Sequence, residues 1–214
     1  MQEQFLNMLR LQDSHNTEVH PQWREQAYPY YRAIWVECAE MLDHFGWKWW
    51  KHQEADLDQV RLELVDIWHF GLSELLRSGE VSLNADPAVP ERLLECFRFD
   101  GTISRGGNEG LRLAIEELAA ATLAQRAFDL NAFVTTMKAL PMSFDELYQM
   151  YIGKNVLNSF RQSHGYKSGK YRKIWNGRED NEHLMELCAE IDPTANDYAD
   201  QLFQALGRRY PGAE

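Results

Sequence analysis

Two segments of the chain, 26 residues apart, repeat the same arrangement of apolar and acidic residues. In each segment apolar side chains recur three or four positions apart, which is the spacing of one face of an α-helix. The apolar stripes are Ile34, Cys38, Met41, Leu42 and Phe45 in the first segment, and Val60, Leu64, Ile67, Gly71 and Leu75 in the second. We therefore expect two amphipathic helices that pack through these stripes as an antiparallel hairpin.

Helical patterns run through most of the remaining chain, and strand patterns are scarce. The expected N-caps include Asp58, Asp129 and Ser143, the last in a capping box with Glu146. The expected helices cover about 3–15, 29–46, 58–79, 90–97, 111–128, a helix from 129 onward, 143–162, 180–190 and 197–206. The sequence thus predicts an all-α helical bundle with a four-helix-type core.

We expect one domain over residues 1–214, with a loop-rich C-terminal third. Its expected parts are core helices at about 3–79 and 107–162, a variable insert at about 81–106, and a mobile C-terminal lobe at about 163–214. Glycine-rich breaks occur at 101–110 and 163–177. The second break has few apolar residues to anchor it, so little burial offsets the cost of ordering its backbone.

The composition is that of a globular protein, with 44% hydrophobic and 26% charged residues. A net charge of −11 argues against a nucleic-acid-binding surface. No apolar run is long enough to span a membrane, and the N-terminus lacks the basic start of a signal peptide. The three widely spaced cysteines form no CxxC pair and indicate a reducing compartment, so we expect a cytoplasmic protein.

Two pairs of acidic residues flank the apolar stripes at matching positions. Glu37 and Glu40 belong to the first helix, and Glu63 and Asp66 belong to the second. Packing of the helices would bring four carboxylates to one edge of the seam, where they repel one another unless a cation neutralises them. Mg²⁺ prefers such oxygen ligands and also bridges to substrate phosphates.

Two other interpretations of these acids remain. With 33 acidic residues in the chain, pairs three positions apart arise by chance and usually form a solvated face. A di-iron bundle would need a carboxylate-x-x-His element, such as Asp66 to His69, on two helices. The position matching His69 in the first helix is Asp43, so a di-iron site is disfavoured.

A concentrated basic segment contrasts with the acidic remainder. It holds seven basic residues and no acidic residue: Lys154, Arg161, Lys167, Lys170, Arg172, Lys173 and Arg178. Lys154, Asn158 and Arg161 share one helix face, and arginine can bind phosphate oxygens in a bidentate fork. No P-loop or dinucleotide fingerprint occurs. The segment is either a phosphate clamp or a solvated tail that pairs with the acidic body.

Amide and aromatic side chains that would suit a nucleotide base occur at Gln12, Asn16, Trp47 and Trp49. Aromatic residues in a helical protein more often belong to the core. Acids that bind Mg²⁺, combined with cations that bind phosphate, are what cleavage of a phosphoanhydride needs.

Several motifs share a resemblance to a known family. They are the segments 35–43, 47–51, 63–70 and 151–162, then Gly165-Tyr-Lys and Trp175-Asn-Gly-x-Glu-Asp-Asn. These motifs resemble the dimeric all-α dUTPases, which belong to the all-α nucleoside-triphosphate pyrophosphatases. The likeness covers most of the chain but little of the part from about 81 to 140.

The resemblance implies Mg²⁺-dependent hydrolysis of dUTP to dUMP and pyrophosphate by a metal-activated water, with dUDP as a further substrate. It implies that Glu37, Glu40, Glu63 and Asp66 bind Mg²⁺ and help to activate the water. It further implies a homodimer and a C-terminal lobe that closes on the nucleotide. The implied base and sugar pocket contains Gln12, Asn16 and Trp47, and the other implied nucleotide contacts, with the cations at phosphates, are Lys154, Asn158, Arg161, Tyr166, Lys173 and Asn181.

Two other functions stay open at this point. A dCTPase/dUTPase or a broader nucleoside-triphosphate pyrophosphatase would use the same chemistry, because a single amide-like contact separates uracil from cytosine. A helical interaction module could keep the fold without catalysis, although all four carboxylates are present.

Overall fold

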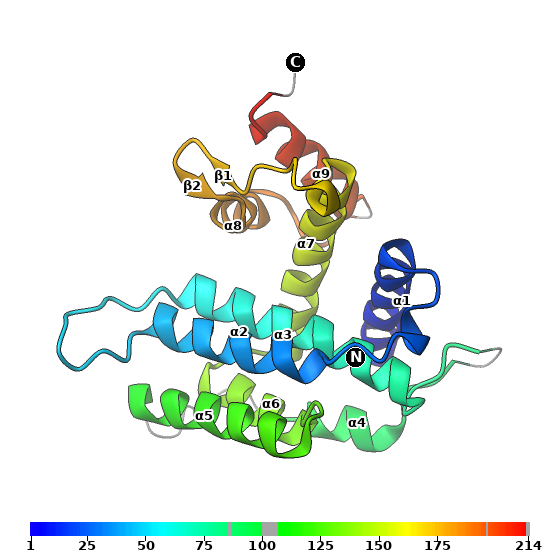
Figure 1. Cartoon of the computed structure of the whole chain (residues 1–214), viewed down its shortest axis with the longest axis vertical. Coiled ribbons are helices and arrows are strands. Elements are labelled where there is room, and N and C mark those ends of the chain that lie inside the picture. The colour runs from blue at the N-terminus through cyan, green and yellow to red at the C-terminus, as the bar shows by residue number, and fades with distance from the viewer. Residues whose placement is uncertain (85–86, 100–106, 196, 213–214) are drawn as a thin grey trace. The chain divides into compact units, whose positions relative to one another are not determined.

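The computed structural model describes residues 1–84, 87–99, 107–195 and 197–212, and α-helices make up most of it (Figure 1). This confirms the all-α fold expected from the sequence. The chain forms two compact units, Met1–Tyr148 and Gln149–Glu214. No helix of the described ranges combines the length and apolar character needed to cross a membrane.

The first unit is built on the hairpin of α2 (Tyr30–Phe45) and α3 (Leu57–Ser78), which lie side by side (Figure 1). The stripe residues Ile34 and Val60 are fully buried, as the packing of two amphipathic faces requires. The N-cap of α3 is Asp56, whose carboxylate accepts a hydrogen bond from the Gln59 backbone. The expected cap at Asp58 is wrong, because that residue already lies in the first helical turn.

The other helices of this unit pack on the hairpin directly or through one another. They are α1 (Gln2–Val19), the short α4 (Glu91–Cys96), α5 (Gly107–Gln125) and α6 (Leu130–Ala139), with a 3-10 turn η1 (Trp23–Glu25). α1 contacts α3, and α5 contacts both α2 and α6. α6 is capped by Asp129, as the sequence predicts.

Two boundaries in this unit differ from the expected ones. α1 runs four residues past the expected end at His15, to Val19. α5 begins at Gly107, inside the expected break at 101–110, whose part 101–106 lies outside the described residues. α5 also ends before Arg126, which has a φ of 54° that no right-handed helix can continue through.

An aromatic cluster forms the centre of this unit. The Trp68 indole stacks on Phe133 with ring centroids 5.1 Å apart, and the edge of Phe5 meets it at 5.3 Å. Phe97 and Phe144 close the cluster, with ring centroids 4.9 Å apart. All five side chains are buried, so they contribute the largest blocks of apolar area to this core.

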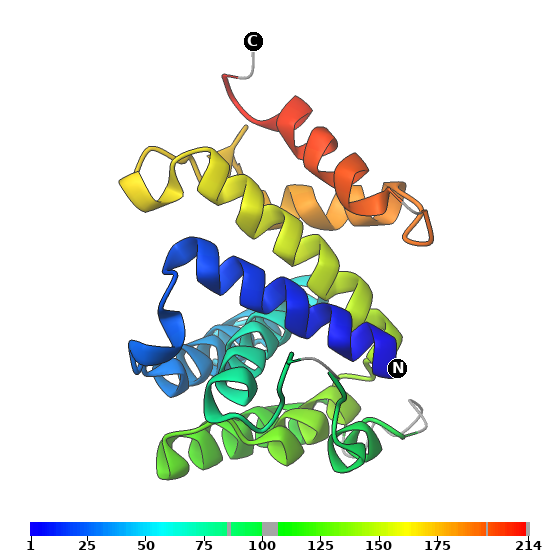
Figure 2. The same cartoon turned by 90° about the vertical axis from the view of Figure 1, so that its right-hand side faces the viewer.

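The second unit contains the rest of α7 (Phe144–Ser163), which begins in the first unit with the expected capping box of Ser143 and Glu146. After α7 come the 3-10 turn η2 (Tyr166–Ser168), the two-residue strands β1 (Ile174–Trp175) and β2 (Arg178–Glu179), α8 (Asp180–Glu190) and α9 (Tyr198–Arg209). α8 and α9, orange and red in Figure 2, pack against each other.

A short antiparallel hairpin replaces part of the expected loop at 163–177. Its turn residues Asn176 and Gly177 both have positive φ, as a two-residue type I′ turn requires. The expectation that little apolar surface anchors this segment is wrong. Trp175 is fully buried, and the Tyr171 ring stacks on Tyr210 with centroids 5.4 Å apart.

The close approach of α3 to Phe128 gives a stability prediction. A Cβ on Gly71 would lie 2.7 Å from the Phe128 ring, so Gly71→Ala forces the core apart and should lower unfolding free energy by about 1–3 kcal/mol. Gly207→Ala in α9 is the matched control, because its Cβ meets nothing closer than 3.9 Å. That change should raise stability by up to about 1 kcal/mol. Urea unfolding measures the free energy of unfolding of both variants. Equal changes in the two would contradict the close contact between Gly71 and Phe128.

Candidate active site

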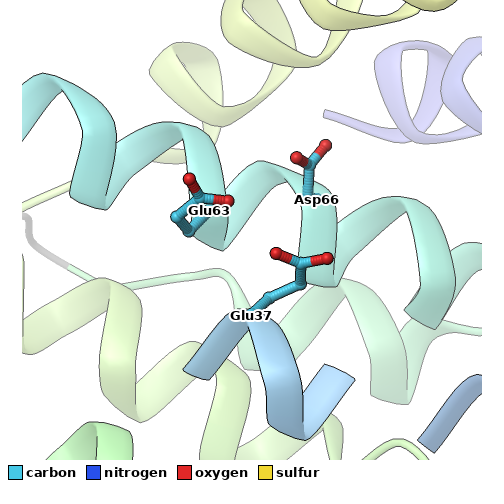
Figure 3. A group of neighbouring side chains, drawn as sticks. All are labelled: Glu37, Glu63 and Asp66. Carbon is cyan, nitrogen blue, oxygen red and sulfur yellow. The ribbon is translucent and has the colours of Figure 1, made fainter. Parts of the chain in front are cut away.

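Three carboxylates from α2 and α3 gather on one side of the hairpin. Glu37 comes from α2, and Glu63 and Asp66 come from α3, three positions apart (Figure 3). One oxygen from each of the three lies within 4.8 Å of the other two. Figure 3 shows Glu37 extending from α2 toward α3, on which Glu63 and Asp66 lie. The matching flanks of the two apolar stripes therefore place these acids together once the stripes pack.

Like charges and burial change the protonation of this group. Burial raises the pKa of Glu37 to about 9, and the negative charges of Asp66, Glu63 and Glu40 add to the increase. Glu63 is buried, and its Oε1 lies 3.5 Å from Nε2 of His44. Glu40 is exposed, one turn after Glu37, and acts on this group through its charge.

The chemistry of this donor set fits a divalent cation. Octahedral Mg²⁺ binds oxygen at about 2.1 Å, so two oxygens on opposite sides of it lie about 4.2 Å apart. The mutual separation of up to 4.8 Å among the three carboxylate oxygens is close to that span. A cation at this position would also remove the repulsion that raises the pKa of Glu37.

A second polar group in the first unit joins α1 to α3. The Oε1 atom of Gln12 lies 2.9 Å from Nδ1 of His69, and its Nε2 donates to Oδ1 of Asn16 at 3.0 Å. Nδ2 of Asn16 donates to the Ser73 hydroxyl at 2.9 Å. The two amides predicted for the base and sugar pocket are therefore adjacent, and side chains of α3 orient them.

Trp47 lies in a different part of the first unit, at the end of α2. Its indole N–H donates to Asp43 at 3.2 Å, and its ring meets Trp50 with centroids 5.2 Å apart. The Asp56 N–H donates to the His44 carbonyl and so holds the end of α2 beside the start of α3. The start of α3 lies about 20 Å along the helix axis from His69. The structure thus separates Trp47 from the Gln12 and Asn16 pair, and its role stays a prediction.

The second unit gathers the predicted phosphate-binding residues around the end of α7. Nζ of Lys154, itself almost fully buried, donates to Oδ1 of Asn181 at 3.0 Å. Nη2 of Arg161 donates to the same oxygen at 3.3 Å, and Nη1 donates to Oδ1 of Asn158 at 3.3 Å. Four of the six predicted residues therefore form one hydrogen-bonded cluster.

The other two predicted residues lie beside this cluster. The Tyr166 ring, half exposed, stacks at 5.9 Å on the guanidinium of Arg161. Lys173 is exposed, and its Nζ lies 3.1 Å from the Glu179 carboxylate. Both side chains are accessible to a ligand in a way that the buried Lys154 amine is not.

A protein-family model described as dUTPase matches residues 4–166. The chain belongs to the all-α dUTPase family. The match extends over most of the chain and includes all four acids and the first four predicted residues of the basic segment, whereas Lys173 and Asn181 lie beyond it. A search of curated proteins found no match. As a member of this family, the chain is an enzyme, a dUTP diphosphatase.

The structure of this dUTPase family member also reveals polar residues that sequence reasoning missed. Asp180 is fully buried, and its carboxylate binds Arg161 through two hydrogen bonds of 2.8 Å. His69 and Ser73 orient Gln12 and Asn16. The available signal for Asp180 was its place in the Glu-Asp-Asn motif after an Asn-Gly turn. His69 gave a signal only as the partner of a di-iron element.

Replacing Glu63 by glutamine tests its charge, because glutamine keeps the shape of the side chain and removes only the negative charge. Glu63→Gln removes one negative charge from a repelling group, so the metal-free protein should melt at the same or a higher temperature. Mg²⁺ at 100 times its dissociation constant should stabilise the unchanged protein by about 2.7 kcal/mol, and this gain should shrink strongly in the variant. Thermal melting with and without MgCl₂ measures both effects.

The matched control is Glu74→Gln, which removes a carboxylate of the same helix that pairs with Arg77. Its Mg²⁺-dependent stabilisation should equal that of the unchanged protein. A large drop in the melting temperature of metal-free Glu63→Gln would mean that Glu63 is a structural partner of His44 instead.

Proposed function

We propose that the chain hydrolyses dUTP to dUMP and pyrophosphate in a Mg²⁺-dependent reaction, and that dUDP is also a substrate. The observation that carries the proposal is the convergence of Glu37, Glu63 and Asp66 from two helices. Three carboxylates of this kind without a cation are electrostatically unfavourable, and the family match supplies the nucleotide substrate.

The four acids of the first unit are proposed as the Mg²⁺-binding residues. Glu37, Glu63 and Asp66 offer oxygens that match the ion's coordination distances, and Glu40 adds negative charge beside them. A bound Mg²⁺ supplies Lewis acidity toward water and phosphate oxygens. Without a cation the raised pKa of Glu37 favours its protonated form, so the proposed Mg²⁺ would also keep Glu37 in the carboxylate form that binds it.

The cations of the second unit are proposed to bind the phosphates. Arg161 contributes a guanidinium charge on the side of Nη1 and Nη2, which also donate to Asn158 and Asn181, and Lys154 adds a charge that Asn181 holds in place. Asn158 and Tyr166 contact Arg161 and would share its ligand. Exposed Lys173 would act as a mobile positive charge.

The paired amides of the first unit are proposed to contact the base or sugar. Gln12 and Asn16 are oriented by His69 and Ser73, so their donors and acceptors face fixed directions. One fixed amide that both accepts from N3–H of uracil and donates to its O4 would not match cytosine, whose N3 accepts and whose N4 amino group donates. This supports preference for dUTP over dCTP.

A homodimer is also proposed. Trp35 and Val36 on α2 are exposed, as are Leu113 and Leu123 on α5. Contiguous exposed apolar area favours burial against another protein chain, and α2 and α5, which carry these residues, contact each other. Light scattering at micromolar concentration should give about twice the 25.0 kDa mass of one chain, and the monomer mass would refute the proposal.

The reaction itself gives the most direct prediction. Purified protein with dUTP and Mg²⁺ should release dUMP and pyrophosphate, separated by anion-exchange chromatography, and EDTA in excess should abolish the reaction. Turnover of dCTP in parallel tests the base preference. Orthophosphate as the only product, or full activity in EDTA, would contradict the proposed chemistry.

The exposed tip of the basic segment gives a prediction about ligand-dependent order. Lys167 and Lys170 are exposed, and they flank residues that we assign to phosphate binding. Trypsin should cleave after these lysines in the ligand-free protein and several-fold more slowly with Mg²⁺ and an α,β-imido analogue of dUTP, because a bound phosphate orders the segment.

Cleavage after the exposed Arg98 in the first unit serves as the internal reference and should not change. Arg161→Ala should remove the protection; because it also leaves the buried Asp180 without its cation, the rates with and without the analogue are compared within the variant. Equal rates with and without the analogue in the unchanged protein would contradict the proposal that the basic segment closes over the phosphates.

A further inference from the structure

A buried carboxylate holds the arginine that we assign to phosphate binding. Asp180 is fully buried at the start of α8, and its Oδ2 and Oδ1 accept hydrogen bonds from Nε and Nη2 of Arg161, each at 2.8 Å. The Tyr171 hydroxyl donates a third hydrogen bond to Oδ2, also at 2.8 Å. Two parallel bonds from one planar group fix its orientation as well as its position.

The surroundings of Asp180 and Tyr171 keep the first ionised and the second protonated. Burial acts to raise the pKa of Asp180, but the hydrogen bonds from Arg161 and Tyr171 and the positive charge of Lys154 hold that pKa below its ordinary value. Burial raises the pKa of the Tyr171 phenol, and the charge of Asp180 raises it further, so the phenol remains an O–H donor.

The contact decides which edge of the guanidinium can meet a ligand. The edge formed by Nε and Nη2 is bound to Asp180. Nη1 points to the other side, toward Oδ1 of Asn158, and Nη2 makes a longer bond of 3.3 Å to Asn181. A guanidinium without this carboxylate could rotate about its side-chain torsions and present any of its edges.

The backbone around Asp180 fixes the carboxylate itself. The Asp180 N–H donates to the Lys173 carbonyl at 2.9 Å, which continues the β1–β2 pairing. The preceding residue, Glu179, forms a capping box with Glu182 at the start of α8. The negative side chain of Asp180 also lies at a helix N-terminus, where the helix dipole favours it.

We propose that Asp180, assisted by Tyr171, is a positioning residue that orients the Arg161 guanidinium toward the phosphates of the nucleotide. The inference rests on the proposed phosphate-binding role of Arg161. A pair that serves only to stabilise the second unit would affect folding and every ligand alike. A positioning role instead affects only ligands that carry phosphates, and only while Arg161 is present.

The test is a series of dissociation constants measured by calorimetry for deoxyuridine, dUMP, dUDP and the α,β-imido analogue of dUTP with Mg²⁺. Asp180→Asn keeps the shape of the side chain but turns an acceptor into a partial donor facing the guanidinium. We expect about 10-fold or greater loss of affinity for the diphosphate and triphosphate ligands, and less than about twofold for deoxyuridine.

A double-mutant cycle distinguishes positioning from general stabilisation. In an Arg161→Ala background, Asp180→Asn should cause no further loss of triphosphate affinity, because the group that it positions is gone. Glu186→Gln is the matched control on α8, since Glu186 pairs with the exposed Arg178 and with Arg209. It should leave all four dissociation constants unchanged.

The outcomes separate the two proposals. Unchanged phosphate affinity in Arg161→Ala alone would remove the phosphate role of Arg161 and the inference with it. A large loss in Arg161→Ala without one in Asp180→Asn, or equal losses for Asp180→Asn in both backgrounds, would overturn only the inference. If Asp180→Asn does not fold, Tyr171→Phe decides: it keeps the ring and should weaken only the phosphate-bearing ligands, by about threefold.

Discussion

The packing of α2 against α3 through two apolar stripes is the interaction on which the first unit depends. Side chains such as Ile34, Met41, Val60 and Leu64 are fully buried in this seam. Each one contributes about 1.5–3 kcal/mol on burial, and the raised pKa of Glu37 means that its protonation relieves part of the repulsion between the carboxylates along the seam's edge. The fold therefore holds Glu37, Glu63 and Asp66 together without a cation. Because these carboxylates repel one another, binding of a cation among them is favourable.

The second unit holds neighbouring positive charges, where the first unit holds neighbouring negative charges. It holds two cations, Lys154 and Arg161, close to one another on α7, and their charges repel. The Asn181 amide oxygen accepts from both, and the buried Asp180 neutralises one of them. Because Asp180 neutralises only one of the two cations, positive charge remains for a phosphate ligand. Hydrogen bonds within the unit keep the cluster ordered.

The helical parts of the fold could be predicted because apolar periodicity and capping residues are local signals. The ends of α2 and the caps at Asp129 and Ser143 agree with the structure for this reason. The convergence of Glu37 with Glu63 and Asp66 also followed from the sequence, because equal offsets on two packed helices determine it. The cap of α3 was misplaced because Asp56 and Asp58 offer the same side chain at nearly the same place.

Other features could not be read from local patterns. The contacts of Asp180 with Arg161 and Tyr171 join residues 19 and 9 positions apart, and nothing in the spacing specifies which acid meets which cation. The same holds for the pairing of Gln12 with His69, 57 positions away. Isolated aromatic residues also gave no sign that Tyr171 and Trp175 anchor the basic segment, since their partner Tyr210 lies close to the C-terminus.

The Asn176-Gly177 turn places a constraint on chain length. Both residues adopt positive φ, and the register pairs Trp175 with Arg178 and Ile174 with Glu179. Successive side chains along a strand point to opposite sides, so one inserted residue would exchange inward and outward positions and turn Asp180 away from Arg161. In proteins that share this site, the buried aspartate should therefore follow the buried tryptophan by five positions. Insertions should instead occur in the exposed tip near Lys167.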